Sequence, residues 1–327
     1  MTRLTKGYII ALVGTAIWSA TAVFIRYLTE TYHVPPLVVA FWRDLFVSIT
    51  LIVVFAALAP SLLRVDRQHL RFLLLYGFVL SIFNSLWTIA VALNGAAVAT
   101  VLAYSSPAFT AIAGWKLFGE RLHGIKILAV VLSIIGCVFV SGAYDLAAWQ
   151  VNPLGIVTGL LAGVAFAVYS LMGKAASHRN INPWTTLLYI FACAAMFLLF
   201  YDLTLGGLQG LFADPQGAFS GSPAILQIAS PNLLWLGSSW TGWGVLVALA
   251  IGPTIGGYGL YMVSLTYLPA SVANLIATLE PSMTAVQSYL FLGERFTREQ
   301  VIGAGLVIVG VILLRIGESR APAAAPA

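Results

Sequence analysis

Residues 97–121 read AVATVLAYSSPAFTAIAGWKLFGER, and residues 271–295 read SVANLIATLEPSMTAVQSYLFLGER. The two stretches align without a gap, so that Pro107 falls on Pro281 and the Gly-Glu-Arg of 119–121 falls on that of 293–295. Each is an apolar run of membrane-spanning length, interrupted near its centre by proline and closed by a charged turn. A duplicated, proline-interrupted span predicts a transporter with two related halves and a site between them.

The composition indicates that the whole chain lies in a membrane. Apolar residues make up 60% of the 327 positions and charged residues only 8%, whereas soluble domains carry about 25% charged residues. We predict an all-α polytopic membrane protein, because open sheet edges cannot face lipid. The formal charge of +5 then reports orientation rather than nucleic-acid binding. Cys137 and Cys193 lie inside apolar runs, which indicates packing rather than a disulfide.

Ten runs reach the ~20 apolar residues that a spanning helix needs. We therefore predict ten transmembrane helices, over residues 7–28, 35–59, 71–92, 96–118, 124–143, 153–175, 183–202, 242–265, 270–292 and 299–316. Proline, glycine and asparagine pairs separate the runs and predict loops, among them Asn94-Gly95 between the third run and the fourth.

The ten runs divide into two sets of five. We predict a first repeat over residues 1–145, a second over 146–320, and a disordered tail over 321–327. The second repeat carries an insertion at about 203–241, which we interpret as an external spacer anchored by tryptophans, with a lid as the alternative. Residues 12–26 align, with weaker similarity, with residues 160–174, and Trp18 then aligns with Phe166.

The basic residues predict the orientation. With the amino terminus inside, 12 of the 16 Lys and Arg residues fall at cytoplasmic ends, as the positive-inside rule requires. Both termini are then cytoplasmic. Because five is odd, the second repeat enters the membrane in the opposite sense to the first. Inverted repeats of this kind are a common construction in secondary transporters that alternate access.

Several of these features together resemble the drug/metabolite transporter superfamily, in its EamA-repeat branch. They are the two sets of five runs, the proline of each duplicated span, the closing LFGER and FLGER, and the FWRD of residues 41–44. The WSAT of residues 18–21, followed by Ile25-Arg26, is similar to aromatic amino acid exporters of the YddG type. The resemblance implies a carrier that exports amino acids (aromatic, Thr or Met-like) and related metabolites across a bacterial inner membrane by alternating access.

Glu280 is the first candidate for a substrate site. It lies about 15 Å into its span at 1.5 Å per residue. An ionised carboxylate at that depth is costly unless it faces a cavity, pairs with a cation or is protonated. We favour a site for the substrate's ammonium group, or for a coupling proton, over a carboxyl that only bonds a neighbouring helix. Pro107 and Pro281 free backbone carbonyls and are candidate hinges, although proline kinks are frequent in membrane helices.

Arg43 and Asp44 are the other charged group inside a span. Adjacent residues on a helix point about 100° apart, so we expect each to pair with a different helix. We interpret both as buried ion-pairing residues that lock the repeat. The alternative, in which Arg43 holds a substrate carboxylate or switches partners, stays open.

Aromatic and polar residues of the spans complete the candidate site. In addition to Glu280, we expect substrate-binding residues among Trp18, Asn84, Trp87, Tyr104, Ser105, Tyr169, Tyr258, Tyr261 and Asn274. An aromatic-lined cavity suits apolar amino acids through stacking and area burial. Packing or anchoring at the membrane interface is the competing explanation for each Trp or Tyr.

Other classes of function fit the sequence less well. The four histidines fall at predicted loops and Asp44 is the one clear span aspartate, so an intramembrane enzyme is not expected. We expect no cofactor, no metal and no nucleic-acid partner, and the lack of a P-loop motif argues against direct use of ATP. A nucleotide-sugar or other metabolite or drug carrier is the alternative, but such anionic substrates favour a basic residue where this chain has Glu280. The expected partners are an amino acid and the lipid bilayer, with the protein acting as a monomer.

Overall fold

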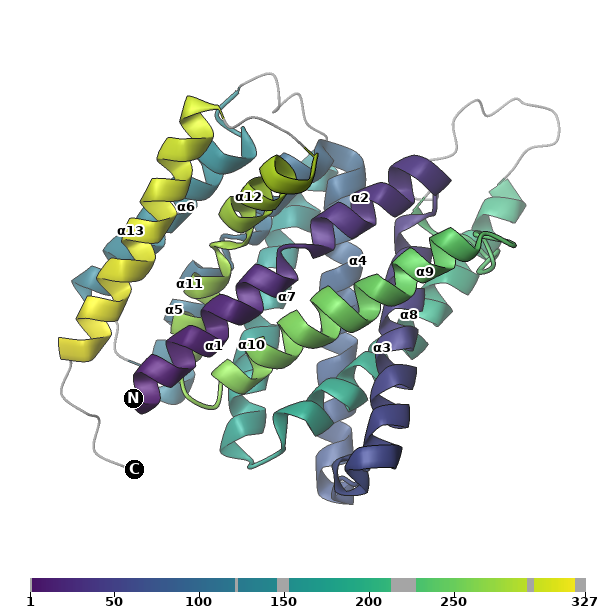
Figure 1. Cartoon of the computed structure of the whole chain (residues 1–327), viewed down its shortest axis with the longest axis horizontal. Coiled ribbons are helices and arrows are strands. Elements are labelled where there is room, and N and C mark those ends of the chain that lie inside the picture. Colours follow the sequence, from purple (N-terminus) through teal and green to yellow (C-terminus); the bar gives the residue numbers. More distant parts are fainter. Residues whose placement is uncertain (1, 121–122, 146–152, 213–227, 293–296, 321–327) are drawn as a thin grey trace.

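The computed structural model describes residues 2–120, 123–145, 153–212, 228–292 and 297–320, and every regular element within these ranges is helical (Figure 1). The elements are α1 (Arg3–Trp18), α2 (Thr21–Tyr32), α3 (Pro36–Leu58), η1 (Pro60–Leu63), α4 (Arg67–Ala103), α5 (Ser106–Phe118), α6 (Gly124–Ser141), α7 (Pro153–His178), α8 (Pro183–Phe212), α9 (Trp240–Leu249), η4 (Ala250–Tyr258), α10 (Gly259–Ser264), α11 (Ala270–Ala277), α12 (Glu280–Leu292) and α13 (Arg298–Arg320). Of these, η1 is a 3₁₀ helix and η4 a π-helix. The all-α prediction is confirmed for this part of the chain.

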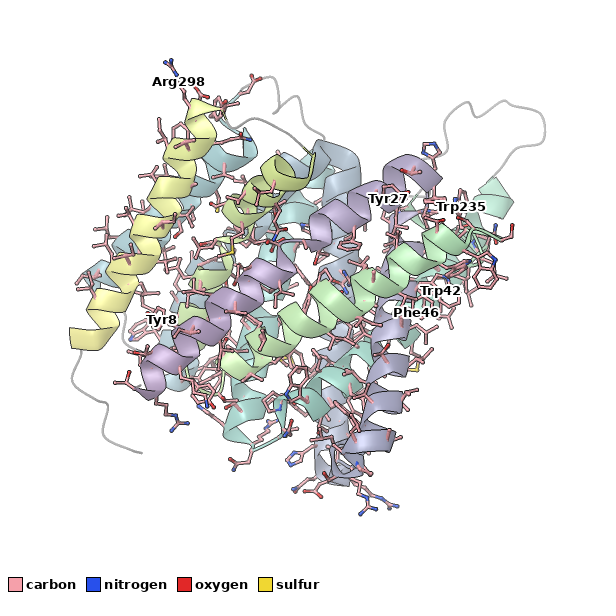
Figure 2. All side chains as sticks on the ribbon, in the orientation of Figure 1. Tyr8, Tyr27, Trp42, Phe46, Trp235 and Arg298 are labelled. Atoms are coloured by element: carbon pink, nitrogen blue, oxygen red, sulfur yellow. The ribbon has the colours of Figure 1, made fainter. Side chains whose placement is uncertain are left out.

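Five helical segments are long and apolar enough to cross a membrane, namely residues 36–58, 67–87, 155–178, 183–207 and 240–264. Large apolar side chains also cover the outside of the bundle (Figure 2). Leu58 is 81% exposed, Leu117 70% and Val53 61%. A soluble monomer rarely exposes so much contiguous apolar surface, so this surface faces lipid and the protein is a membrane protein.

Three of the other predicted runs are each divided between two helices. The breaks fall at residues 19–20, 104–105 and 278–279, and the last two occupy equivalent positions in the duplicated stretch. Pro107 and Pro281 are the second residues of α5 and α12. Proline costs little there, because the first turn of a helix has no intrahelical partner for its N–H groups. The two prolines therefore start new half-helices instead of bending a continuous helix.

Helix α4 differs from the prediction. We expected a loop at Asn94-Gly95, but helix is recorded from Arg67 to Ala103. Phe83 stacks on Phe166 of α7 at 5.1 Å, while a Cβ added at Gly159 would lie 2.7 Å from Leu102. A straight helix would separate Phe83 from Leu102 by about 28 Å, against about 10 Å between Phe166 and Gly159. The chain therefore bends between Phe83 and Leu102 while it remains helical from Arg67 to Ala103, and helical backbone is what an apolar setting favours.

Helices of the two halves alternate across the bundle. α1 and α2 run beside α10, η4 and α9 across one face, α6 packs against α13 at one edge, and α3 packs against α8 on the other side (Figure 1). Helix α4 lies between α7 and α8. The largest buried cluster combines side chains from α1, α3, α4, α7, α8 and η4 through α11, so the two halves share one core.

The predicted insertion at 203–241 is partly helical. Helix α8 continues to Phe212, ten residues beyond the predicted end, and residues 213–227 and the tail 321–327 lie outside the described residues. Residues 228–239 pack on the ends of α2 and α3. Trp42 Nε1 donates to the carbonyl of Leu233 at 2.6 Å and Trp235 Nε1 to the carbonyl of Tyr32 at 3.0 Å (Figure 2). Of the two tryptophans of the insertion, Trp235 is thus held by a backbone hydrogen bond, whereas Trp240 is 88% exposed.

Glu120, from the first Gly-Glu-Arg turn, reaches the second half of the chain. Its carboxylate accepts hydrogen bonds from the backbone N–H of Ala270 at 2.9 Å and from the hydroxyl of Ser271. It also forms a salt bridge with Lys126 at 3.3 Å, and the Glu120 side chain is only 7% exposed. A negative charge at the first turn of α11 offsets the positive end of the helix dipole. Glu120 therefore fixes the start of α11.

Candidate functional site

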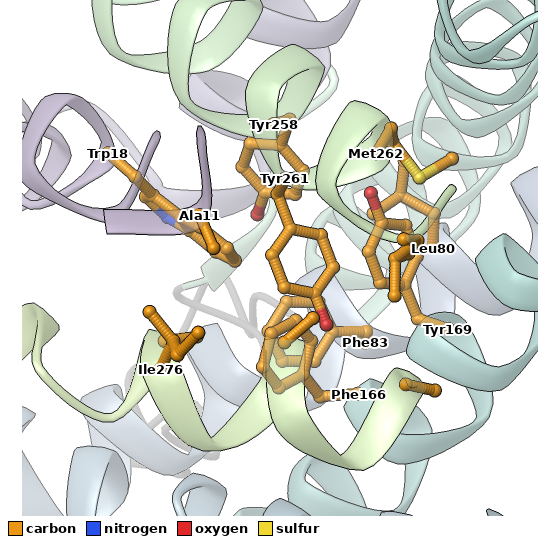
Figure 3. Close-up of a cluster of buried hydrophobic side chains, with 14 of the residues drawn as sticks. Ala11, Trp18, Leu80, Phe83, Phe166, Tyr169, Tyr258, Tyr261, Met262 and Ile276 are labelled. Atoms are coloured by element: carbon orange, nitrogen blue, oxygen red, sulfur yellow. The ribbon is translucent and has the colours of Figure 1, made fainter. Parts of the chain in front are cut away.

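Aromatic side chains fill the interior between α1, α4, α7, η4 and α10 (Figure 3). The ring of Trp18, the last residue of α1, lies 4.3 Å from Tyr258, 5.8 Å from Tyr261 and 5.7 Å from Phe166. All four are less than 7% exposed. Phe83 extends the cluster by stacking on Phe166. The structure thus brings together predicted site residues from both halves, and adds two phenylalanines that no polar feature of the sequence distinguishes from packing residues.

Tyr169 lies on the far side of this cluster. Its ring is 5.1 Å from Tyr76 of α4 and 6.3 Å from Tyr261, and it is completely buried. Tyr76 is held by a contact of 3.4 Å between its hydroxyl and the sulfur of Met262. Tyr169 also lies 5.9 Å from Phe166 and 6.1 Å from Tyr258, so it is packed into the aromatic cluster.

Asn274 is the centre of a buried polar network. Its Nδ2 donates to Thr110 Oγ1 at 3.1 Å and to Ser170 Oγ at 2.9 Å, and its Oδ1 accepts from Ser106 Oγ at 2.9 Å. Ser170 Oγ lies in turn 2.7 Å from the hydroxyl of Tyr261. Both amide N–H groups of Asn274 are used and its side chain is completely buried. The amide therefore joins α5, α7 and α11 in this conformation.

Glu280 and Tyr104 meet where the two duplicated stretches break. Tyr104 follows the end of α4, and its hydroxyl donates a hydrogen bond to Oε2 of Glu280 at the start of α12. Tyr104 is 7% exposed, whereas Glu280 keeps part of its surface accessible. Ser105, next to Tyr104, donates to the carbonyl of Leu102 at 2.6 Å. Of these three predicted residues, Glu280 retains capacity for a further partner, because a carboxylate has about four acceptor positions.

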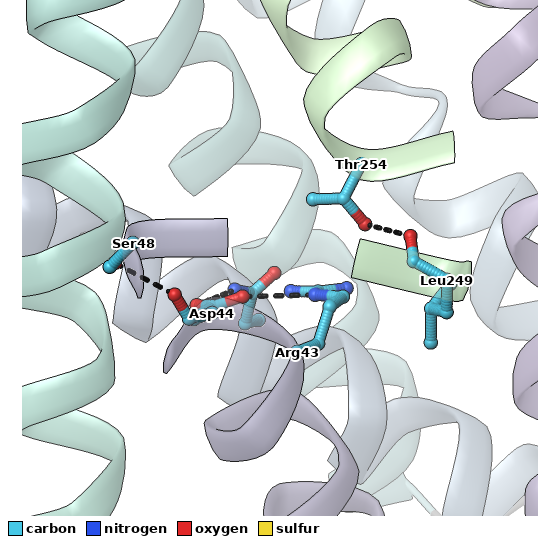
Figure 4. Close-up of polar contacts among 6 residues, drawn as sticks. Arg43, Asp44, Ser48, Leu249 and Thr254 are labelled. Atoms are coloured by element: carbon cyan, nitrogen blue, oxygen red, sulfur yellow. Dashed lines mark hydrogen bonds and ion pairs between the residues drawn. The ribbon is translucent and has the colours of Figure 1, made fainter. Parts of the chain in front are cut away.

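Arg43 and Asp44 form an ion pair within one helix (Figure 4). Arg43 Nε donates to Oδ1 of its neighbour at 2.9 Å, and Asn84 Nδ2 of α4 donates to Oδ2 at 3.2 Å. Ser48 Oγ donates to the backbone carbonyl of Asp44 at 2.8 Å. The expectation that the two charges pair with different helices is therefore wrong for Arg43. Its long side chain folds back, which the angular separation of neighbouring backbone positions does not prevent.

A cavity borders this ion pair. It is lined by Ile25, Pro36, Val39, Ala40, Arg43, Asn84 and Trp87, and encloses about 310 Å³ with its mouth. The enclosed part of this cavity holds only about one or two water molecules, so it is far smaller than a small-molecule site of about 300–1,000 Å³. Two predicted site residues, Asn84 and Trp87, thus line the same cavity as Arg43.

Tyr258 connects the two charged groups. Its phenol lies close enough to interact electrostatically with Arg43, with Asp44 and with Glu280, and its ring packs on Trp18. The interior therefore carries a basic side chain on α3 and an acidic one on α12, with Tyr258 packed on Trp18 in the aromatic cluster.

Broken apolar helices that bring charged side chains into a buried interior define a membrane transporter. The sequence profile of the EamA-like transporter family matches residues 5–142 and again residues 153–316, and the chain belongs to that family. The resemblance inferred from the motifs is confirmed, and the protein is a transporter rather than an enzyme.

Relatives of this chain come from bacteria and archaea. A probable amino-acid metabolite efflux pump of Escherichia coli K12 is 25% identical over 312 residues, which cover 94% of each chain. The threonine/homoserine exporter RhtA of the same organism is 26% identical over 258 residues, 79% of this chain and 75% of its own. A solved crystal structure superposes with a TM-score of 0.71 over 97% of this chain and 98% of the other, at 18% identity, which supports the fold alone.

Proposed function

We propose that the protein is a secondary transporter that exports amino acids, aromatic ones, threonine and methionine-like ones among them, with related small metabolites. The observation that carries this proposal is the partly accessible Glu280, held by Tyr104 beside an aromatic interior. A carboxylate there suits an ammonium group, and the rings suit an apolar side chain. Two relatives are named as an amino-acid metabolite efflux pump and a threonine/homoserine exporter, which supports the same substrate class.

The proposed architecture is ten transmembrane helices in two inverted repeats, residues 1–145 and 146–320. The contact between α6 and α13 supports the inversion. With Gly136 aligned on Gly310, Ala129 aligns on Gly303. A Cβ added at Gly136 would lie 2.6 Å from the carbonyl of Gly303, and one at Gly310 would lie 2.9 Å from that of Ala129. These equivalent helices thus run antiparallel, which requires a local twofold axis perpendicular to both.

The aligned segments 12–26 and 160–174, at the start of each half, also support an inverted relationship between the halves. Trp18 and Phe166, aligned in the weaker repeat, contact each other at 5.7 Å. Equivalent residues that touch lie near a twofold axis. We therefore infer that the substrate path of the inverted-repeat carrier lies at this aromatic cluster, between the halves. Exchanging the conformations of the two halves would then open this path to one side and afterwards to the other.

The proposed location is a bacterial inner membrane, with both termini cytoplasmic and the protein acting as a monomer. The distribution of Lys and Arg supports this orientation. Helix α1 begins and helix α13 ends on the same side of the bundle, which agrees with termini on one side of the membrane (Figure 1).

Efflux from preloaded proteoliposomes tests the proposal. We expect threonine, methionine and phenylalanine to leave faster than from liposomes without protein, and Glu280→Gln to slow that efflux at least about tenfold, as expected for loss of one charged contact. Glu299→Gln, at the first turn of α13, is the control with the same chemical change. Efflux no faster than from empty liposomes would contradict the substrate class. Normal efflux by Glu280→Gln would assign that residue to structure.

A further inference from the structure

The guanidinium of Arg43 is buried but only partly used. Arg43 is 6% exposed, and its Nε donates to Asp44. Within the described residues no group accepts a hydrogen bond from Nη1 or Nη2, and Nη2 is fully buried. Because a guanidinium carries five N–H donors in a planar fork, most of its donors remain for another acceptor. Buried polar groups normally have hydrogen-bond partners, so unpaired N–H donors on a buried guanidinium are unusual.

The surroundings of Arg43 hold the side chain in place. Asp44 is completely buried, and its two carboxylate oxygens accept from Arg43 and from Asn84. This carboxylate is therefore occupied on both oxygens and orients the guanidinium through Nε. Nη2 of the same guanidinium has no partner, and Arg43 lines the cavity together with Asn84 and Trp87.

Carboxylates match such a fork better than other groups do. A carboxylate accepts two parallel N–H bonds from a guanidinium, with charge assistance that a carbonyl or hydroxyl lacks. The rest of the cavity wall is apolar apart from Asn84 and consists of Ile25, Pro36, Val39, Ala40 and Trp87. A ligand with one carboxylate next to an apolar body fits this combination.

We propose that Arg43 binds the carboxylate of the exported amino acid, with Asp44 as a positioning residue and Trp87 as part of the wall for the apolar portion. This inference rests on the proposed function and extends it to the recognition of the carboxylate. The enclosed space holds only about one or two water molecules, so a whole amino acid enters when the helices around the cavity separate.

The competing explanation is that Arg43 only neutralises Asp44. A double variant separates the two. Arg43→Gln alone leaves a buried carboxylate without its cation and is expected to destabilise the fold. Arg43→Gln combined with Asp44→Asn removes both charges; Asn keeps the shape of the Asp44 side chain, and the shorter Gln keeps a polar amide at position 43. If Arg43 is only a counter-ion, the double variant should recover binding as well as folding.

The measurement is ligand-dependent thermal stabilisation of purified protein in detergent, with phenylalanine, methionine and threonine each compared with its primary amide. The amide keeps the ammonium group and side chain but lacks the carboxylate. We expect wild type and Arg64→Gln, an exposed arginine, to prefer each acid over its amide at least about tenfold. The folded double variant should bind acid and amide about equally, and Arg43→Lys should fall between.

The outcomes separate the two hypotheses. If wild type binds the acids and the double variant keeps the same preference for acid over amide, Arg43 is a structural counter-ion. The inference that Arg43 binds the carboxylate is then overturned, while the proposed function stands. If wild type binds none of the acids, the proposed substrate class fails and the inference fails with it. Loss of the preference in a double variant that unfolds within a few degrees of wild type supports carboxylate binding.

Discussion

Glu120→Gln is the substitution whose effect the structure specifies most directly. The Glu120 carboxylate accepts from the N–H of Ala270 and the hydroxyl of Ser271, and it pairs with Lys126. Glutamine keeps the shape of the side chain but removes the charge and turns one acceptor into a donor. The Ser271 hydroxyl could accept from this donor, but the N–H of Ala270 could not, and the neutral amide would no longer form an ion pair with Lys126.

The magnitude follows from these contacts. A hydrogen bond to a charged group contributes about 1.5–3 kcal/mol, and favourable charge at a helix amino terminus adds about 0.3–1 kcal/mol. Both apply, since the Glu120 side chain is 7% exposed and Lys126 3%. The amide retains one acceptor oxygen, so part of the interaction survives. We expect a loss of about 2–4 kcal/mol in unfolding free energy.

The assay is denaturant unfolding of the purified protein in detergent. Glu299→Gln, with the same chemistry on the first turn of α13, is expected to change stability by about 0.5 kcal/mol or less. Ser271→Ala removes a single hydrogen bond to the charged carboxylate and should cost about 1.5–3 kcal/mol. Equal stability of Glu120→Gln and Glu299→Gln would refute the view that the first repeat fixes the start of α11.

Two further substitutions test the packing. Gly136→Leu should destabilise by about 1–3 kcal/mol through overpacking, because an added Cβ would lie 2.6 Å from the carbonyl of Gly303. Gly305→Leu on the same pair of helices meets no atom within 4 Å, so its unfolding midpoint should match wild type, and equal losses in both would contradict the contact. Trp18→Ala should cost about 3–5 kcal/mol and Trp18→Phe clearly less, since a ring still reaches Tyr258. Similar unfolding midpoints for these two variants would show that the ring is not part of the core.

The sequence alone was sufficient for the class of the protein and much of its organisation. An apolar composition and runs of spanning length depend only on chain chemistry, since the bilayer imposes its thickness on each helix separately. The duplicated stretch also located the breaks before α5 and α12, because Pro107 and Pro281 limit the backbone wherever they occur. The motif of the Gly-Glu-Arg turns led to the family, which the profile match confirmed.

Turn signals in the sequence predicted the ends of the helices less reliably. Asn94-Gly95 is a strong turn signal, yet α4 is recorded as helical through it, and α8 extends past the predicted start of the insertion. Turn propensity is a weak preference, whereas an unpaired backbone group in an apolar environment costs about 2–7 kcal/mol. Because this cost exceeds the turn preference, the backbone stays helical through both stretches.

Only the tertiary structure decided which polar side chains meet. Asn274 was a candidate ligand in the sequence, but side chains of α5 and α7 occupy both of its amide donors and bond its carbonyl oxygen. Arg43 was expected to reach another helix, but it folds onto Asp44 and keeps a fork unused beside the cavity. Glu120 reaches Ala270, 150 positions away. A sequence specifies which groups need partners, but partners depend on the directions and rotamers of side chains from distant segments, which packing alone sets.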